Sequence, residues 1–208
     1  AMTRSVPVLM YHHVSPHPGL VTVSPETFEE HIAGLARKKY RALAADEFLE
    51  FLQGKRALSG RHVLITFDDG YLDNYVYAWP ILQRYGLKAT IFAITGLIGE
   101  GAARAYLGAA KALPATPDHR ACKAAVAEGR ADEVMLRWSE IQAMEASGAV
   151  EIHSHTHSHV RWDQLHTDKA QRLAAVEADL KAARAALKTH LGKDSRHLCW
   201  PWGYFEPE

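Results

Sequence analysis

An apolar run that ends on two adjacent carboxylates constrains this chain more than any other stretch of it. Residues 63–67, Val-Leu-Ile-Thr-Phe, have the composition of a short buried strand, and Asp68, Asp69 and Gly70 follow at once. Two neighbouring carboxylates at the end of a buried strand repel each other and lose hydration, so they require a cation or a shared proton. A surface turn at Asp-Gly is the alternative, but a turn requires neither the second Asp nor so apolar a lead-in. We therefore interpret the two carboxylates as part of a functional site.

Composition bounds the class of protein. The 208 residues suffice for one domain with a sizeable core. Lys plus Arg and Asp plus Glu number 24 each, so no long-range field draws the chain to nucleic acid or to an anionic membrane. Cys122 and Cys199 lack C-x-x-C spacing and predict neither a disulfide framework nor a zinc knuckle.

No apolar run has transmembrane length, and no signal peptide opens the sequence. If Met2 is the native start, we expect a cytoplasmic protein. If a leader has been removed, we expect a periplasmic or extracellular one.

Strand and helix patterns alternate along the chain, without an internal repeat or a linker. The expected strands are residues 6–10, 63–67, 88–94, 149–153 and 197–200, and the expected helices are residues 24–40, 46–54, 73–85, 139–148 and 167–192. This alternation predicts a parallel sheet with helical crossovers. A closed barrel of this kind takes about 250 residues and about eight strands. We therefore expect a single α/β domain over residues 1–208, in the form of a distorted (β/α)7-type barrel that is incomplete or truncated.

Four helices are expected to begin at a capping side chain. The caps are Ser24, Asp46, Thr167 and, in a capping box with Gln142, Ser139. Between these elements, residues 96–137 form an Ala- and Gly-rich insertion. We interpret this insertion as decoration of one face, with a substrate lid as the alternative.

Four histidines alternate in residues 153–159, directly after an expected strand. On a strand all four would share one face, whereas helical spacing would align His153 with His157 or His155 with His159. Either geometry brings two imidazoles to one metal ion, with Zn–N distances of about 2.0–2.1 Å. A solvated polar loop is the alternative, and spacing alone does not choose between the two pairs. One Asp and two His leave an open position on a divalent ion, as a hydrolytic site requires, and free the other Asp to act as a base.

Several motifs together resemble one family. Residues 66–70 and 155–159 resemble, in order and surroundings, the first two motifs of the NodB-homology polysaccharide deacetylases, carbohydrate esterase family four. Residues 201–203 resemble the third motif, and the likeness extends to residues 10–12, 88–92 and 138–148. In motif style the chain is most similar to the branch that acts on poly-N-acetylglucosamine.

The resemblance implies a metal centre and a base. Asp69, His155 and His159 are the implied ligands of one divalent ion, with Zn²⁺ as the first choice and Co²⁺, Ni²⁺ or Fe²⁺ as alternatives. Asp68 is the implied general base. His153 and His157 would then lie behind the ligands or face solvent.

The resemblance also implies contacts for a carbohydrate substrate. The backbone N–H near Trp202 corresponds to the family's oxyanion donor. His12, Pro201 and Tyr204 are expected to contact the substrate.

The implied function is removal of N-acetyl groups from GlcNAc-type amino sugars of a bacterial cell-surface polysaccharide or glycolipid precursor, by hydrolysis of a linear amide bond. An amidase or deformylase acting on another small amide is one alternative, and a catalytically impaired carbohydrate-binding relative is another. Cys199 stands where many members carry an Arg that orients the catalytic Asp. The motif with the general-acid histidine is expected beyond Glu208, so the C-terminal part of the barrel is expected to be missing.

Overall fold

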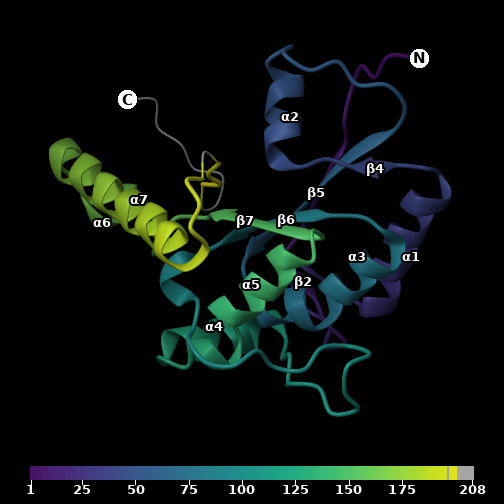
Figure 1. Cartoon of the computed structure of the whole chain (residues 1–208). Coiled ribbons are helices and arrows are strands. Elements are labelled where there is room, and N and C mark those ends of the chain that lie inside the picture. Colours follow the sequence, from purple (N-terminus) through teal and green to yellow (C-terminus); the bar gives the residue numbers. More distant parts are fainter. Residues whose placement is uncertain (196, 201–208) are drawn as a thin grey trace.

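A parallel sheet forms the centre of the computed structural model, which describes residues 1–195 and 197–200 (Figure 1). The strands lie in the order β1, β5, β6 and β7, with β4 paired to the start of β5, and every pairing among them is parallel. Their bounds are Val8–Tyr11 (β1), Arg41–Ala42 (β4), His62–Asp69 (β5), Ala89–Ala93 (β6) and Val150–Ser154 (β7). The predicted α/β class is thereby confirmed. Over the described residues the sheet stays open, with β1 and β7 at the two ends of the strand order, as expected of an incomplete barrel.

Two shorter strand pairings lie outside this order of strands. β2 (His13–Val14) and β3 (Thr22–Val23) form a separate parallel pair. The strand predicted at residues 197–200 is reduced to one parallel bridge between Ser154 and Leu198, supported by a hydrogen bond from Cys199 N to Ser154 O (2.9 Å). The strand predicted at residues 197–200 is therefore wrong in length, since only Leu198 forms a bridge there.

Helices cover mainly one face of the sheet. Figure 1 shows α1, α3 and α5 gathered on one side and α2 on the other, with α7 projecting from the β7 edge. Their bounds are Pro25–Arg37 (α1), Ala45–Leu52 (α2), Trp79–Tyr85 (α3), Trp138–Ala146 (α5) and Lys169–Leu191 (α7). The short helix α6 spans Trp162–Leu165. None of the described helices combines the length and the apolar character needed to cross a membrane.

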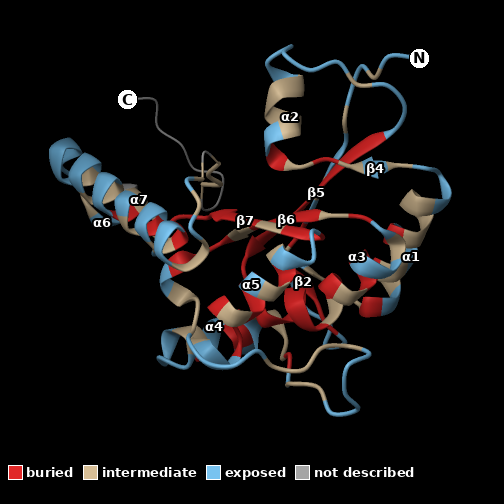
Figure 2. Cartoon of the chain, in the orientation of Figure 1, coloured by how far each residue is buried: buried red, intermediate tan, exposed pale blue. Residues whose placement is uncertain are grey.

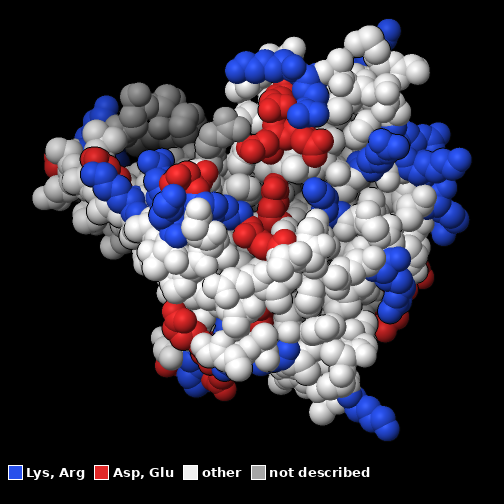
Figure 3. Space-filling model, in the orientation of Figure 1, with Lys and Arg blue, Asp and Glu red and all other residues white. Residues whose placement is uncertain are grey.

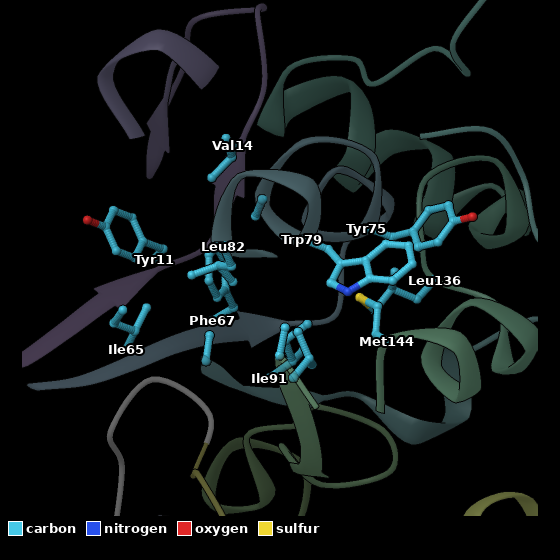
Figure 4. Packing of buried hydrophobic residues seen from close by; sticks show 14 of the residues in the cluster. Tyr11, Val14, Ile65, Phe67, Tyr75, Trp79, Leu82, Ile91, Leu136 and Met144 are labelled. Carbon is cyan, nitrogen blue, oxygen red and sulfur yellow. The ribbon is translucent and has the colours of Figure 1, made fainter. Parts of the chain in front are cut away.

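The core lies between the sheet and these helices. Paired residues in neighbouring strands share a face, and the buried row Tyr11, Phe67, Ile91 and Ile152 faces the helices. Figure 4 shows members of this cluster from the strands together with Leu82 and Trp79 of α3. Figure 2 shows the buried residues concentrated along the sheet and on the sides of α1, α3 and α5 that face it.

Two rows of paired residues on the other face of the sheet are mostly polar, and the second contains Asp68 of the site. Thr66, Thr90 and Glu151 are paired across β5, β6 and β7, followed by Asp68, Phe92 and His153. Because side chains alternate along a strand, these residues point away from the helix-covered face. The chain therefore places carboxylates at the C-terminal end of β5 and imidazoles at that of β7, two parallel strands separated by β6.

Only one of the four predicted helix caps is confirmed. Ser24 accepts a hydrogen bond from Thr27 N (3.0 Å) at the start of α1. Thr167 is not the cap of α7, because Asp168 caps it by accepting from Gln171 N (2.9 Å). The long helix ends, as expected, on a left-handed Gly192.

The other two caps are replaced by glutamates. Asp46 lies within the first turn of α2, whose first N–H group, Ala45 N, donates to Glu151 Oε1 (2.5 Å) from β7. The Ser139–Gln142 capping box does not form, since Glu140 accepts from Arg137 N (2.8 Å) at the start of α5. The Ser139 hydroxyl donates instead to Gly101 O (2.7 Å).

The helix predicted at residues 73–85 begins as a π-helix, η1 (Asn74–Ala78), and continues as α3. Pro80 has no N–H group and its ring clashes with the carbonyl of Val76, four residues earlier. A wider turn accommodates this clash, and Trp79 N accordingly donates to Asn74 O, five residues back.

Residues 96–137, the segment interpreted from the sequence as an insertion, pack against the rest of the described chain. This segment contains α4 (His119–Ala127) and η3 (Ala131–Glu133), and the 3-10 turn η2 (Thr95–Leu97) leads into it. Arg104 anchors it through a two-pronged ion pair with the fully buried Glu140 (both N–O distances 2.9 Å). On the surface shown in Figure 3, acidic side chains gather near the middle and several basic side chains lie along the right-hand side, although the chain carries equal numbers of the two.

Candidate active site

Strand β5 ends in a strained turn at the two carboxylates. Regular alternation would direct Asp68 and Asp69 to opposite faces of the sheet. Asp69 instead has φ of 82° and Gly70 has φ of 85°, so two consecutive residues are left-handed. Ile94 N donates to Asp69 O (3.1 Å) and Leu136 N to Gly70 O (3.0 Å), which holds this turn in place. Left-handed non-glycine residues are costly and concentrate at functional sites.

The histidine run follows neither of the two geometries that its spacing suggested. The strand ends at Ser154, and a turn with positive φ at Thr156 (64°) and His159 (55°) follows. The turn is held by Thr156 N donating to Ser154 Oγ and by His159 N donating to Thr156 Oγ1, both at 3.0 Å. The imidazoles of His155 and His159 thereby converge, with ring centroids 4.7 Å apart.

These two turns bring three ligand-type atoms together. Asp69 Oδ1 lies 3.3 Å from His155 Nε2 and 3.4 Å from His159 Nε2. Among the described residues, however, the buried Asp69 Oδ1 has no hydrogen-bond partner. An unsatisfied buried carboxylate oxygen is costly, and a cation between it and the two imidazoles would satisfy it. One carboxylate oxygen and two imidazole nitrogens are ligands that a divalent transition metal accepts, so this set fits such an ion.

A hydrogen bond from the other ring nitrogen of His155 orients its Nε2 atom as a metal ligand. His155 Nδ1 donates to Cys199 O (2.8 Å), which leaves Nε2 facing Asp69. A metal-ligating histidine commonly donates its other ring N–H to a carbonyl in this way. The backbone of Cys199 is therefore part of the site.

Burial and charge set the protonation of the three groups. Burial raises the pKa of Asp69, but the close contact and charge of His155 and the charge of His159 outweigh it and lower the pKa to about 2. Burial lowers the pKa of His159 to about 4. Burial also lowers the pKa of His155, but contact with Asp69 and with Cys199 raises it to about 10. Asp69 is thus an anion and His159 is neutral, while a bound cation would take the place of the His155 proton.

Asp68 lies beside this cluster. Burial raises the pKa of its carboxyl group, and the charges of His155 and His12 oppose that rise. His12 Nε2 lies 3.7 Å from Asp68 Oδ2. The Sγ atom of Cys199 lies 3.8 Å and 3.9 Å from the two carboxylate oxygens.

The other two histidines of the run lie outside the cluster. His153 is buried, and its Nδ1 lies 2.5 Å from Ser195 Oγ. His157 Nδ1 lies 2.9 Å from Thr95 Oγ1. A Cβ atom on Gly96 would lie 2.5 Å from His157 O, so only glycine permits this close approach to the histidine turn.

A hydrogen-bonded chain of Asp73, His13 and His119 was not predicted from the sequence. His13 Nδ1 donates to Asp73 Oδ2 (2.6 Å), and His13 Nε2 lies 2.9 Å from His119 Nδ1 of the insertion. The His13 ring stacks on Tyr71, with ring centroids 3.8 Å apart. The sequence pointed to this contact only in that His13 and Asp73 each follow a predicted strand. Nothing in the sequence of residues 96–137 distinguishes His119.

The remaining predicted site residues, Pro201, Trp202 and Tyr204, lie outside the described residues. Of the other five, the structure brings Asp68, Asp69, His155 and His159 together and places His12 at their edge.

Comparison with known families identifies the chain. The sequence profile of the family described as polysaccharide deacetylase matches residues 55–208. The chain therefore belongs to the polysaccharide deacetylase family, which confirms the resemblance that its motifs carry.

Two curated relatives are bacterial proteins. YxkH of Bacillus subtilis (strain 168), whose name assigns it to the polysaccharide deacetylases, is 45% identical over 94 residues, which are 45% of this chain and 33% of that protein. The poly-β-1,6-N-acetyl-D-glucosamine N-deacetylase of Staphylococcus aureus (strain MRSA252) is 26% identical over 186 residues, 88% of this chain. The chain spans about half (54%) of the length of this staphylococcal relative.

Solved structures share the fold. IcaB from Ammonifex degensii has a TM-score of 0.73 at 27% identity, with 97% of this chain and 76% of that chain covered. The de-N-acetylase from Aggregatibacter actinomycetemcomitans has the same TM-score of 0.73 at 22% identity, with 97% and 81% covered. The second likeness supports the fold alone.

Proposed function

We propose that this protein is a metal-dependent N-deacetylase. Its substrate would be the N-acetylated, GlcNAc-type amino sugars of a bacterial cell-surface polysaccharide or glycolipid precursor. The observation that carries the proposal is the convergence of Asp69 Oδ1, His155 Nε2 and His159 Nε2 around an unsatisfied buried oxygen, beside a second carboxylate. Family membership and the staphylococcal relative named as a poly-β-1,6-N-acetyl-D-glucosamine N-deacetylase support the substrate class. We also propose residues 1–208 as one catalytic domain, with residues 96–137 as an insertion.

In this proposal Asp69, His155 and His159 hold one divalent ion, with Zn²⁺ as the first choice and Co²⁺, Ni²⁺ or Fe²⁺ as alternatives. Such an ion would polarise the acetamide carbonyl and stabilise the negative charge that develops on its oxygen. The hydrogen bond from His155 Nδ1 to Cys199 O keeps the ligating nitrogen oriented.

Asp68 acts as the general base. It takes a proton from the attacking water, whose oxygen bonds to the carbonyl carbon. The C–N bond then breaks as the nitrogen takes this proton back from Asp68, which gives acetate and a free amine. A carboxyl group whose pKa is raised by burial is a stronger base than an exposed one. His12, at 3.7 Å from Asp68, lies where it would contact a sugar bound over the two carboxylates. We propose the backbone N–H of Trp202 as an oxyanion donor, and Pro201 and Tyr204 as further substrate contacts.

Acetate release from β-1,6-linked N-acetylglucosamine oligomers tests this function. The wild type, loaded with Zn²⁺, is expected to release acetate, and Asp68→Asn is expected to lose about 10²-fold or more of the rate. Ser158→Ala, at an exposed position between the two ligating histidines, is the matched control and should keep the rate.

A metal-loaded wild type that releases no acetate from any amino sugar would overturn the proposal. Release of formate from another small amide would point instead to a deformylase or amidase. An Asp68→Asn variant as fast as the wild type would remove Asp68 from the mechanism.

A further inference from the structure

A second group of metal-ligating side chains overlaps the first. The ligand atoms of Asp68, His155 and Cys199 lie within 4.8 Å of one another, as do those of Asp69, His155 and His159. Cys199 Sγ contacts both oxygens of Asp68, at 3.8 Å and 3.9 Å. The described residues thus hold two donor triads that share one imidazole.

The two triads differ in chemical preference. The first offers one oxygen and two nitrogens, whereas the second offers one oxygen, one nitrogen and one sulfur. Thiolate ligands favour soft, thiophilic cations, whereas oxygen ligands favour hard ones. The second triad therefore selects for a different class of ion.

Sharing His155 makes the two triads exclusive. His155 Nδ1 is hydrogen-bonded to Cys199 O, so the ring has one nitrogen left for a metal, Nε2. An ion that uses His155 and Cys199 removes a ligand from the first triad. It also coordinates the carboxylate of Asp68.

The two cysteines of the chain differ in their surroundings. Cys199 is partly exposed and lies against a carboxylate. Cys122 is buried in the insertion, and its Sγ contacts Pro117 O. Cys122 belongs to neither donor triad, so it provides an internal control.

We propose that Asp68, His155 and Cys199 form an inhibitory site for a thiophilic divalent cation such as Cd²⁺. On binding, the Cys199 S–H bond breaks, a sulfur–cadmium bond forms, and the proton passes to solvent. The bound ion occupies Asp68 and His155 together. Its inhibitory effect rests on the proposed function, whereas its binding does not.

Cadmium titration of metal-free protein tests binding without reference to activity. The ultraviolet charge-transfer band of a cadmium thiolate should grow in the wild type and saturate at one ion per chain. Cys122→Ser should behave as the wild type, and Cys199→Ser should show no band. Asp69→Asn, which disables the first triad alone, should keep the band. Asp68→Asn should weaken cadmium binding by about tenfold or more.

The outcomes separate this site from the proposed function. Absence of the band in the wild type, or its persistence in Cys199→Ser, overturns the site. Circular dichroism of each variant checks that the fold is retained, and the Asp68→Asn titration tests the site by a second route. If the wild type is a deacetylase, the cadmium concentration that halves its rate should rise about tenfold or more in Cys199→Ser. An unchanged value overturns the inhibitory role.

Discussion

Asp69 and Gly70 show at the scale of single residues how backbone strain builds the site. Both residues have positive φ, which costs about 1–3 kcal/mol at a non-glycine residue. The cost is tolerated because Ile94, directly after β6, and Leu136, before α5, fix the turn through hydrogen bonds. The turn directs Asp69 Oδ1 towards the two imidazoles, where regular alternation would have turned it away.

Substitution of Gly70 tests this turn. A Cβ atom there would lie 3.2 Å from Ala93 Cβ, at a backbone angle that alanine disfavours. Gly70→Ala should therefore lower the free energy of unfolding by about 2–4 kcal/mol, from the φ penalty and the clash together. Gly54→Ala is the matched control, because Gly54 has φ of 72° but an added Cβ would meet nothing within 4 Å. Equal destabilisation of the two variants in chemical denaturation would show that the packing against Ala93 is unimportant.

Glu151 connects three elements at the scale of strands and helices. Its carboxylate accepts hydrogen bonds from Ala45 N of α2 (2.5 Å) and from Thr90 of β6 (3.0 Å), and it lies 3.6 Å from His153 Nε2. Burial raises its pKa, but the contacts with His153, Ala45 and Thr90 outweigh burial and lower the pKa to about 2. A carboxylate at a helix N-terminus is also favoured by the helix dipole.

This connection predicts a pH-dependent stability. Because the folded-state pKa of Glu151 lies below its ordinary value of 4.5, its contribution is present above about pH 4.5 and is lost as the pH falls towards 2. Glu151→Gln should therefore cost on the order of 2–3 kcal/mol at pH 7 and progressively less below pH 4.5. Glu128→Gln, which removes a surface carboxylate paired with Arg130, should change stability by less than about 1 kcal/mol. A cost for Glu151→Gln that is the same at pH 3 and pH 7 would contradict this.

Asp73 ties three further elements together. Its carboxylate accepts from His13 Nδ1 (2.6 Å), from Val14 N (2.9 Å) and from Asn74 Nδ2 (3.1 Å), and His13 in turn contacts His119 of α4. The Asp73 side chain is buried, so a substitution that removes its carboxylate would leave one of these donors buried without an acceptor, at the cost of desolvating it.

Asp73→Asn replaces one accepting oxygen with a donor, which leaves His13 or Val14 without its acceptor. We expect a loss of about 1–3 kcal/mol in the free energy of unfolding. Asp118→Asn is the control, because Asn caps a helix about as well as the Asp118 that caps α4. If thermal melting places both variants within about 0.5 kcal/mol of the wild type, the Asp73 contacts contribute little.

Elements were predicted from the sequence more reliably than their ends. Apolar periodicity located the four main strands and the long helices, because burial dictates residue type along a whole element. Three of the four predicted caps were wrong. Glu151 and Glu140 accept hydrogen bonds at the starts of α2 and α5 in place of the expected caps. At α7 the cap is Asp168, one residue after the expected Thr167. A cap supplied from a distant strand leaves no signal in the local sequence.

At the scale of the whole molecule, parallel topology explains why residues 68–69 and 155–159 meet. Both segments follow parallel strands, and the carboxyl ends of such strands lie at one edge of the sheet. That much was predictable from the sequence. The convergence of His155 with His159 was not, because it depends on the positive φ of Thr156 and His159 and on hydrogen bonds within the turn. The contact between Cys199 and Asp68, which are 131 residues apart in the sequence, likewise depends on the bridge between Ser154 and Leu198.

The zinc dissociation constant of tag-free protein, measured by competition with a chromophoric chelator, tests the proposed metal centre most directly. The wild type should bind one Zn²⁺ per chain. Asp69→Asn and His159→Ala should each bind it more than about 100-fold more weakly. Removal of a group that only hydrogen-bonds to a ligand costs less, about 10–100-fold. Asp68→Asn should stay within about tenfold of the wild type, since Asp68 is proposed as the base and not as a ligand of this ion. Wild-type affinity in both Asp69→Asn and His159→Ala would contradict the proposed site.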